Sequence, residues 1–167
     1  MWAFTVKRAL YALTLCVIAG CTAPPAYSEQ AGFESLTLER TPCFGGCPIY
    51  SATVDREGEI RFQGTRFVAA TGPRAAHISP TQVAELATAL NAAHFSELHA
   101  SYRTEADGCT ALATDHPGTV IRARIGGVEK SVNYYTGCSG IAEVERIAAL
   151  ARRIDEIAGT QRWIVAP

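Results

Sequence analysis

The segment Thr41-Pro42-Cys43-Phe44-Gly45-Gly46-Cys47-Pro48 most constrains the fold, because it holds two cysteines, two prolines and two glycines. Cysteines four positions apart would share one face of a helix. Proline and glycine at this density disfavour a helix, so we predict a tight loop that leads into a strand. A bridge between Cys43 and Cys47 would close a small ring and stabilise the fold by about 2 kcal/mol, less any strain.

Three uses of this cysteine pair are open from sequence. A structural disulfide is the favoured one. A redox pair is the second, although Cys-x3-Cys departs from the Cys-x2-Cys of thioredoxin-like sites and no βαβ pattern surrounds it. The third is a zinc site with Cys109 and Cys138, which are 29 positions apart. Structural zinc sites usually bring their ligands in two close pairs, so this spacing argues against zinc.

The N-terminus has the parts of a secretory signal. Lys7 and Arg8 precede an apolar run over 9–20, which is shorter than the roughly 20 residues that span a bilayer. Ile18-Ala19-Gly20-Cys21 resembles the lipobox of bacterial lipoproteins, in which the cysteine is lipidated and becomes the new N-terminus. We therefore predict a signal peptide over 1–20 and a lipid anchor on Cys21 that holds the protein to a membrane.

The same resemblance implies a location in the cell envelope. Thr22 follows Cys21, whereas Asp at that position favours retention in the inner membrane in enterobacterial-type sorting. We therefore expect the outer membrane, with the protein facing the periplasm. Residues 21–33 include two prolines and small residues without periodicity, which predicts a tether. Its twelve residues after Cys21 reach at most about 40 Å.

Composition limits the classes of function. Cleavage removes Lys7 and Arg8, so 13 of the 15 basic residues remain against 16 acidic ones, a net charge of −3. This mildly acidic balance argues against nucleic-acid binding. No nucleophile elbow or phosphate loop is present in the sequence, and we assign no catalytic residue, metal or cofactor. The histidines show no metal-ligand spacing: His77, His94, His99 and His116.

An oxidising compartment makes disulfides the default for the remaining cysteines. Cys109 and Cys138 flank a predicted strand pair, and a hairpin would bring its two ends together. Four cysteines allow three pairings, of which Cys43–Cys47 with Cys109–Cys138 is favoured. The second bridge would add about 3.5 kcal/mol.

Hydrophobic periodicity predicts grouped strands and two helices. The first helix begins at a capping box formed by Ser79 and Gln82 and ends near Ala93; the second runs from 141 to 157 and ends at Gly159. Residues 99–118 read as loop. The expected strands are 35–40, 50–54, 60–64, 66–70, 119–125 and 129–135. We predict an α+β fold over 34–167, a single domain with an antiparallel sheet of about five to six strands and two helices on one face.

Other side chains are weaker candidates. The loop over 105–116 carries Glu105, Asp107 and Asp115 without the spacing of a calcium loop, which indicates a solvated loop. Asp115 could pair with Lys130 across neighbouring strands. Four aromatic residues could line a ligand groove or, more commonly, pack in the core: Tyr50, Tyr134, Tyr135 and Trp163.

The run Cys-Phe-Gly-x-Cys-Pro-x-Tyr that begins at Cys43 resembles the signature of domain-of-unknown-function family 6438. The resemblance extends from Glu34 to Gly159 and includes both helices. Further positions that fit are Gly58, Gly64, Asp115 and the strand 130–134. The resemblance implies an envelope α+β domain, often lipid-anchored, with no assigned activity and no catalytic residue. Cys109 does not match the family pattern, so its pairing rests on spacing and compartment.

These observations favour a non-catalytic binding or assembly module, with an envelope protein or a small ligand as partner. The alternative is a thiol-redox protein or another small envelope enzyme that uses Cys43 and Cys47.

Overall fold

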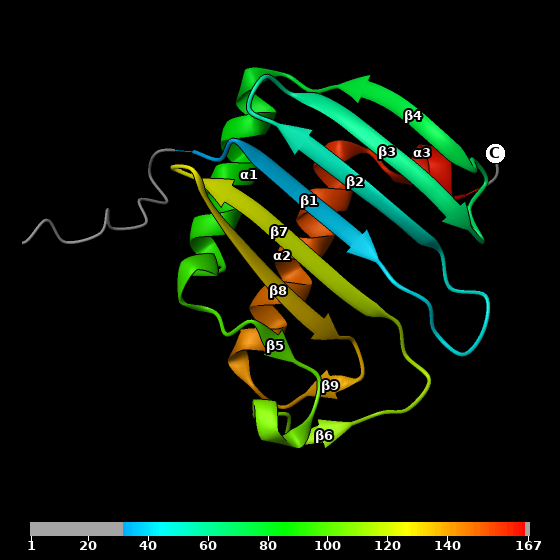
Figure 1. Cartoon of the computed structure of the whole chain (residues 1–167), viewed down its shortest axis with the longest axis vertical. Helices are drawn as coiled ribbons and strands as arrows, with labels where there is room; N and C mark the ends of the chain where they lie inside the picture. Colours follow the sequence, from blue (N-terminus) through cyan, green and yellow to red (C-terminus); the bar gives the residue numbers. More distant parts are fainter. Residues whose placement is uncertain (1–31, 166–167) are drawn as a thin grey trace, which may run out of the picture.

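The computed structural model describes residues 32–165 and shows an α+β fold, as the sequence predicts (Figure 1). Seven strands form one sheet in the order β4-β3-β2-β1-β7-β8-β5, which exceeds the expected five to six. All neighbours run antiparallel except β5 and β8, which are parallel. The sheet strands are β1 (Ser35–Arg40), β2 (Ile49–Asp55), β3 (Glu59–Arg66), β4 (Gly72–His77), β5 (Ser101–Tyr102), β7 (Gly118–Ile125) and β8 (Val128–Tyr135).

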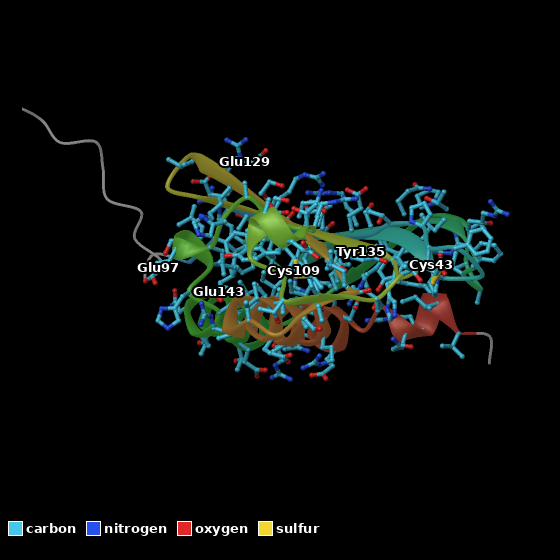
Figure 2. All side chains as sticks on the ribbon, turned by 90° about the horizontal axis from the view of Figure 1, so that it is seen from below. Cys43, Glu97, Cys109, Glu129, Tyr135 and Glu143 are labelled. Carbon is cyan, nitrogen blue, oxygen red and sulfur yellow. A yellow bond between two sulfur atoms is a disulfide. The ribbon has the colours of Figure 1, made fainter. Side chains whose placement is uncertain are left out.

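Two long helices cover one face of this sheet, α1 (Pro80–Ala92) and α2 (Ala142–Ala158) (Figure 2). The predicted capping box is confirmed: Ser79 accepts a hydrogen bond from the backbone N–H of Gln82, and the Gln82 side chain accepts one from Ser79. Gly159 ends α2 with φ 62°, the left-handed conformation that favours glycine. Both helix predictions are therefore confirmed to within one or two residues.

The expected strand over 66–70 is wrong. Phe67 has φ 54° and the chain turns there, so the fourth strand, β4, begins only at Gly72. The N–H groups of Ala69 and Ala70 donate instead to the carbonyls of Ile164 and Trp163 in the short helix α3 (Gln161–Ile164), which the sequence did not predict. Pro73 is tolerated in β4 because this strand lies at the sheet edge, where a missing N–H costs nothing.

The region over 99–118 is also more regular than expected. It contains β5, a short 3-10 turn over Glu105–Asp107, and β6 (Ala111–Leu112), which pairs with β9 (Cys138–Ser139). The short length of these strands explains why no periodicity signals them. These short elements pack at the open end of the β7–β8 hairpin, opposite its turn.

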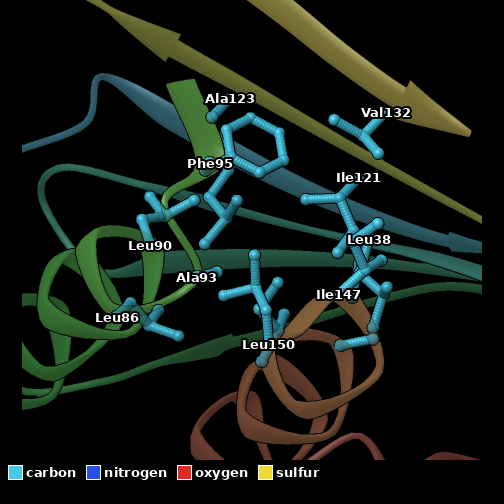
Figure 3. Close-up of a cluster of buried hydrophobic side chains, with 14 of the residues drawn as sticks. Leu38, Leu86, Leu90, Ala93, Phe95, Ile121, Ala123, Val132, Ile147 and Leu150 are labelled. Carbon is cyan, nitrogen blue, oxygen red and sulfur yellow. The ribbon is translucent and has the colours of Figure 1, made fainter. Parts of the chain in front are cut away.

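The core lies between the sheet and the two helices (Figure 3). Leucines of α1 and isoleucines of α2 meet alternate residues of β1 and β8, so these strands bury one side each. In β7 the first four residues are buried on both sides, and alternation begins only at Ile121. The side chains in the close-up include Leu38, Leu86, Leu90, Phe95, Ile121, Val132, Ile147 and Leu150.

Lys130 closes the core beside the 3-10 turn that follows α1. Its Nζ donates to the carbonyl oxygens of Ser96 and Leu98 at 2.6 and 2.7 Å. The expected pair with Asp115 is wrong, because Asp115 lies in the loop before β7 and accepts a hydrogen bond from Thr114 Oγ1. The β7–β8 register places Lys130 opposite Ala123, well away from that loop.

Candidate functional site

The candidate site is the end of the sheet at which β1 leads into the loop Pro42–Pro48. The structure joins Cys43 to Cys47 within this loop, with Cα atoms 5.8 Å apart, and Cys109 to Cys138, with Cα atoms 5.3 Å apart. These are the two pairs that the spacing favoured. Cys109 and Cys138 are buried, whereas Cys43 and Cys47 are partly exposed. The two bridges therefore differ in their access to solvent.

A buried polar network fixes both ends of the loop. Arg40, the last residue of β1, donates from Nη2 to Asp155 Oδ2 at 2.7 Å and from Nη1 to Thr119 Oγ1 at 3.0 Å. On the far side of the loop, the Tyr50 hydroxyl donates to Asp155 Oδ1 at 2.7 Å. Asp155 lies on α2 and is 7% exposed. One carboxylate thus holds the strand that enters the loop and the strand that leaves it.

Two further contacts complete this support. Thr160, which follows the glycine that ends α2, donates from Oγ1 to Asp155 Oδ1 at 2.7 Å. Thr41 donates its N–H to the Gly118 carbonyl at 3.0 Å, and Thr41 Oγ1 accepts from the Gly118 N–H at 2.9 Å. The loop is therefore held by β7 as well as by α2.

Burial sets the protonation behaviour of the network. Burial and the neighbouring Asp155 carboxylate raise the pKa of Tyr50 above its ordinary value, so the phenol keeps its proton. Burial alone would lower the pKa of Arg40, but the charge and hydrogen bond of Asp155 outweigh it and raise that pKa. Arg40 and Asp155 therefore form a charged pair that Tyr50 completes as a neutral donor.

Phe44 takes part neither in this network nor in the disulfide of the loop. It is 89% exposed at the tip of the disulfide-closed loop. Phe67 lies beside the same loop: a Cβ built on Gly46 would be 3.9 Å from the Phe67 ring, which is itself 45% exposed. Exposed aromatic side chains on a fixed loop are available for contact with another molecule.

The four aromatic candidates from the sequence do not form one ligand groove. Tyr50 and Trp163 both pack against Phe62 in the core, with ring centroids 5.4 and 4.8 Å from that of Phe62. Tyr134 is buried, and burial raises its pKa. Tyr135 instead fixes the loop before β7, because its hydroxyl donates to the Ala113 carbonyl at 2.7 Å.

In the loop over 105–116, the Asp107 carboxylate caps backbone N–H groups. Asp107 Oδ2 accepts from the N–H groups of Arg103 and Thr104 and from Ser101 Oγ, which lowers the pKa of Asp107. Between residues 32 and 165, no group of three or more His, Cys, Asp or Glu side chains could hold a metal ion. Within the same range, no helix has the length and apolarity needed to cross a membrane. Cys21 and the predicted signal peptide lie outside the described residues.

A shallow pocket of about 390 Å³ lies beside the loop and includes Arg40, Pro42, Ile49 and Tyr50 in its wall. A larger one of about 700 Å³ lies at the opposite end of β1, against α1 and the Phe33–Glu34 backbone. The walls of this larger pocket include no residue of the signature. The pocket beside the loop includes Tyr50 of the signature.

Sequence reasoning identified the loop but missed Asp155 and Phe67. Asp155 follows Ala151 by four residues on α2 and so falls on the buried face of that helix, which was the available signal. Phe67 was assigned to a strand that does not form.

Fold and site together define a small α+β domain in which a signature disulfide loop is supported by a buried Arg–Asp–Tyr network. The chain belongs to the family described as Domain of unknown function (DUF6438), which it matches over residues 34–158. A comparison with curated proteins finds no match.

Proposed function

We propose that this protein is a non-catalytic binding module of the cell envelope, anchored to the outer membrane through acylated Cys21 and facing the periplasm. Its docking element is the tip of the loop Pro42–Pro48. The observation that carries the proposal is the 89% exposure of Phe44 on a loop that is closed by a disulfide and fixed at both ends.

Such a loop loses little conformational freedom on binding. Pre-organisation of a contact residue lowers the entropic cost of association. Aromatic side chains that fill a pocket of a partner commonly contribute the largest share of the binding energy. Exposure of an aromatic residue brings no stability to the free protein, so a contact with another molecule is the role that fits Phe44.

Thiol–disulfide exchange is the second candidate, because Cys43 and Cys47 are partly exposed. A reactive cysteine needs a nearby cation or helix N-terminus to lower the pKa of its thiol. Arg40 is the nearest cation in sequence, and its guanidinium is directed to Asp155 and Thr119. This favours the binding role.

Photocrosslinking in intact cells tests the docking element. The photoreactive analogue p-benzoylphenylalanine replaces Phe44 in one strain and Val128 in another. Val128 is 49% exposed and begins β8 at the opposite end of the sheet; its neighbour Glu129 lies far from Cys43 (Figure 2). We expect a light-dependent adduct of defined mass from position 44 only, and a weaker one when Cys43 and Cys47 are both serine. Equal labelling from both positions would remove the loop from the proposal.

Intact mass spectrometry of the protein extracted from the envelope tests the anchor. We expect a chain that begins at Cys21 and carries acyl mass. An unmodified Cys21 would remove the anchor while leaving the crosslinking test unaffected.

A further inference from the structure

The end of the sheet that carries Phe44 is both apolar and free of available acidic groups. Five large apolar side chains are exposed in the described part of the chain, and three of them lie at this end: Phe44 at 89%, Phe67 at 45% and Val165 at 60%. Val165 follows α3, whose carbonyls accept the N–H groups of Ala69 and Ala70 just after Phe67. We call Phe44, Phe67, Val165 and Arg66 the apolar end.

Three segments build the apolar end: 40–50, 64–74 and 159–165. They contain four arginines and no Asp or Glu, although the chain as a whole has more acidic than basic residues. The nearest carboxylates are used elsewhere. Asp155 is buried against Arg40, and Glu39 points to the uncovered face of the sheet, where it pairs with Arg122 at 2.9 Å.

Arg66 is the positive charge that lies beside the exposed Phe67 ring. Its guanidinium carbon lies 4.6 Å from the centre of the Phe67 ring, and Arg66 makes no ion pair with a described carboxylate. Two of the other arginines are less available, because Arg40 pairs with Asp155 and Arg162 donates to the carbonyls of Ala158 and Gly159. Arg74 is exposed on β4 and donates to the Pro73 carbonyl at 2.7 Å; like Arg66, it makes no ion pair with a described carboxylate.

We infer that the apolar end binds a protein partner that offers an apolar pocket for Phe44 with carboxylates at its rim, placed to pair with Arg66. This inference rests on the proposed docking function and names its partner chemistry. A membrane surface fits less well, because membrane recognition by charge uses clusters of about four to eight basic residues, whereas this end offers only Arg66 and Arg74 among its described residues. A single Arg stacked on an aromatic ring is typical of a protein interface.

Charge reversal tests the inference. The full-length protein with p-benzoylphenylalanine at position 44 is combined with Arg66→Glu, Arg66→Lys or, as matched control, Arg56→Glu. Arg56 is an exposed arginine in the β2–β3 turn at the opposite end of the sheet. We expect Arg66→Glu to lower the adduct yield about tenfold, since like charges across an interface suppress association. Arg66→Lys and Arg56→Glu should keep most of it. The melting temperature of each variant shows whether it is folded.

The outcomes separate the two proposals. A protein adduct from position 44 that is indifferent to Arg66→Glu would overturn the acidic rim and leave the docking loop in place. An adduct whose added mass is that of a phospholipid would overturn the protein partner. Absence of any adduct from position 44 would overturn the proposed function itself.

Discussion

The Tyr50 hydroxyl lies 2.7 Å from Asp155 Oδ1, across 105 positions of sequence, and so joins the strand that leaves the signature loop to the far end of α2. Arg40 reaches the same carboxylate from the strand that enters the loop. Removal of either the Tyr50 or the Arg40 contact should both loosen the loop and destabilise the fold.

Replacement of Tyr50 by phenylalanine should lower the free energy of unfolding by about 1–2 kcal/mol, because Asp155 loses one of its buried donors. The measurement is urea denaturation. Tyr135→Phe is the matched control, since its hydroxyl bonds in an exposed loop and its loss should cost less. Equal losses of unfolding free energy in the two variants would show that the buried Tyr50 hydrogen bond stabilises the fold no more than an exposed one.

Replacement of Asp155 by asparagine should cost more, about 3 kcal/mol, because the Arg40 guanidinium then lacks its countercharge in a mostly buried position. Combined with Tyr50→Phe, the two losses should not add, since both variants act on the same hydrogen-bond network around position 155. Strict additivity in the double-mutant cycle would contradict the network.

The raised pKa of Tyr50 predicts a loss of stability at alkaline pH. An unfolded tyrosine ionises near pH 10, about its ordinary pKa, whereas the folded one retains its proton. The contribution is therefore fully present below about pH 10 and is lost as the pH rises toward the folded pKa. Tyr134, whose pKa burial also raises, adds to the same slope.

We expect the urea midpoint of Tyr50→Phe, relative to its own value near neutral pH, to fall less between about pH 9 and pH 11 than that of the unmodified protein. The two proteins are compared in the same buffers, so effects of the other tyrosines cancel. Parallel pH profiles would show that Tyr50 ionises equally easily in the folded and unfolded chain.

The two disulfides should differ in reactivity. Cys43–Cys47 is partly exposed and its loop is held by the Asp155 network, so mild reductant should open it without unfolding, at a cost of at most about 2 kcal/mol. Cys109–Cys138 is buried and should resist reduction until the domain unfolds. Alkylation followed by peptide mass mapping, with the melting temperature recorded at each reductant concentration, measures this order. Simultaneous opening of both bridges would contradict it.

Two glycines of one hairpin should respond differently to alanine. A Cβ on Gly64 would overlap the Ala70 carbonyl oxygen, so Gly64→Ala should cost about 3 kcal/mol. Gly72 has φ 79° with open space around it, so Gly72→Ala should cost about 1 kcal/mol through backbone strain alone. Thermal denaturation of the two variants gives the comparison, and the reverse order would contradict the packing of β3 against the turn before β4.

Local signals predicted much of this fold from sequence. Ser79 and Gln82 marked the start of α1, alternation marked β1, and Gly159 marked the end of α2. Gly126-Gly127 marked the turn between β7 and β8. Each of these signals is contained within a few neighbouring residues. The turn at Phe67 was missed because its conformation depends on contacts with α3, nearly a hundred positions later.

The candidate site was predictable only in part. The signature identified the loop and its cysteines, since two prolines and two glycines leave few conformations. Its support by Asp155 was not predictable, because the carboxylate joins residues that meet only when the sheet packs on α2. Solvent exposure of Phe44 likewise depends on where the finished fold directs the loop.

The position of Lys130 has a practical consequence for detection of this protein. The sequence contains two lysines, Lys7 within the predicted signal peptide and Lys130, and the Lys130 ammonium is held by the carbonyls of Ser96 and Leu98. Reagents that couple to primary amines, including the common bifunctional succinimidyl esters, therefore meet almost no reactive nitrogen on the folded domain. Crosslinking based on amine chemistry is therefore a poor way to detect any complex that this domain forms.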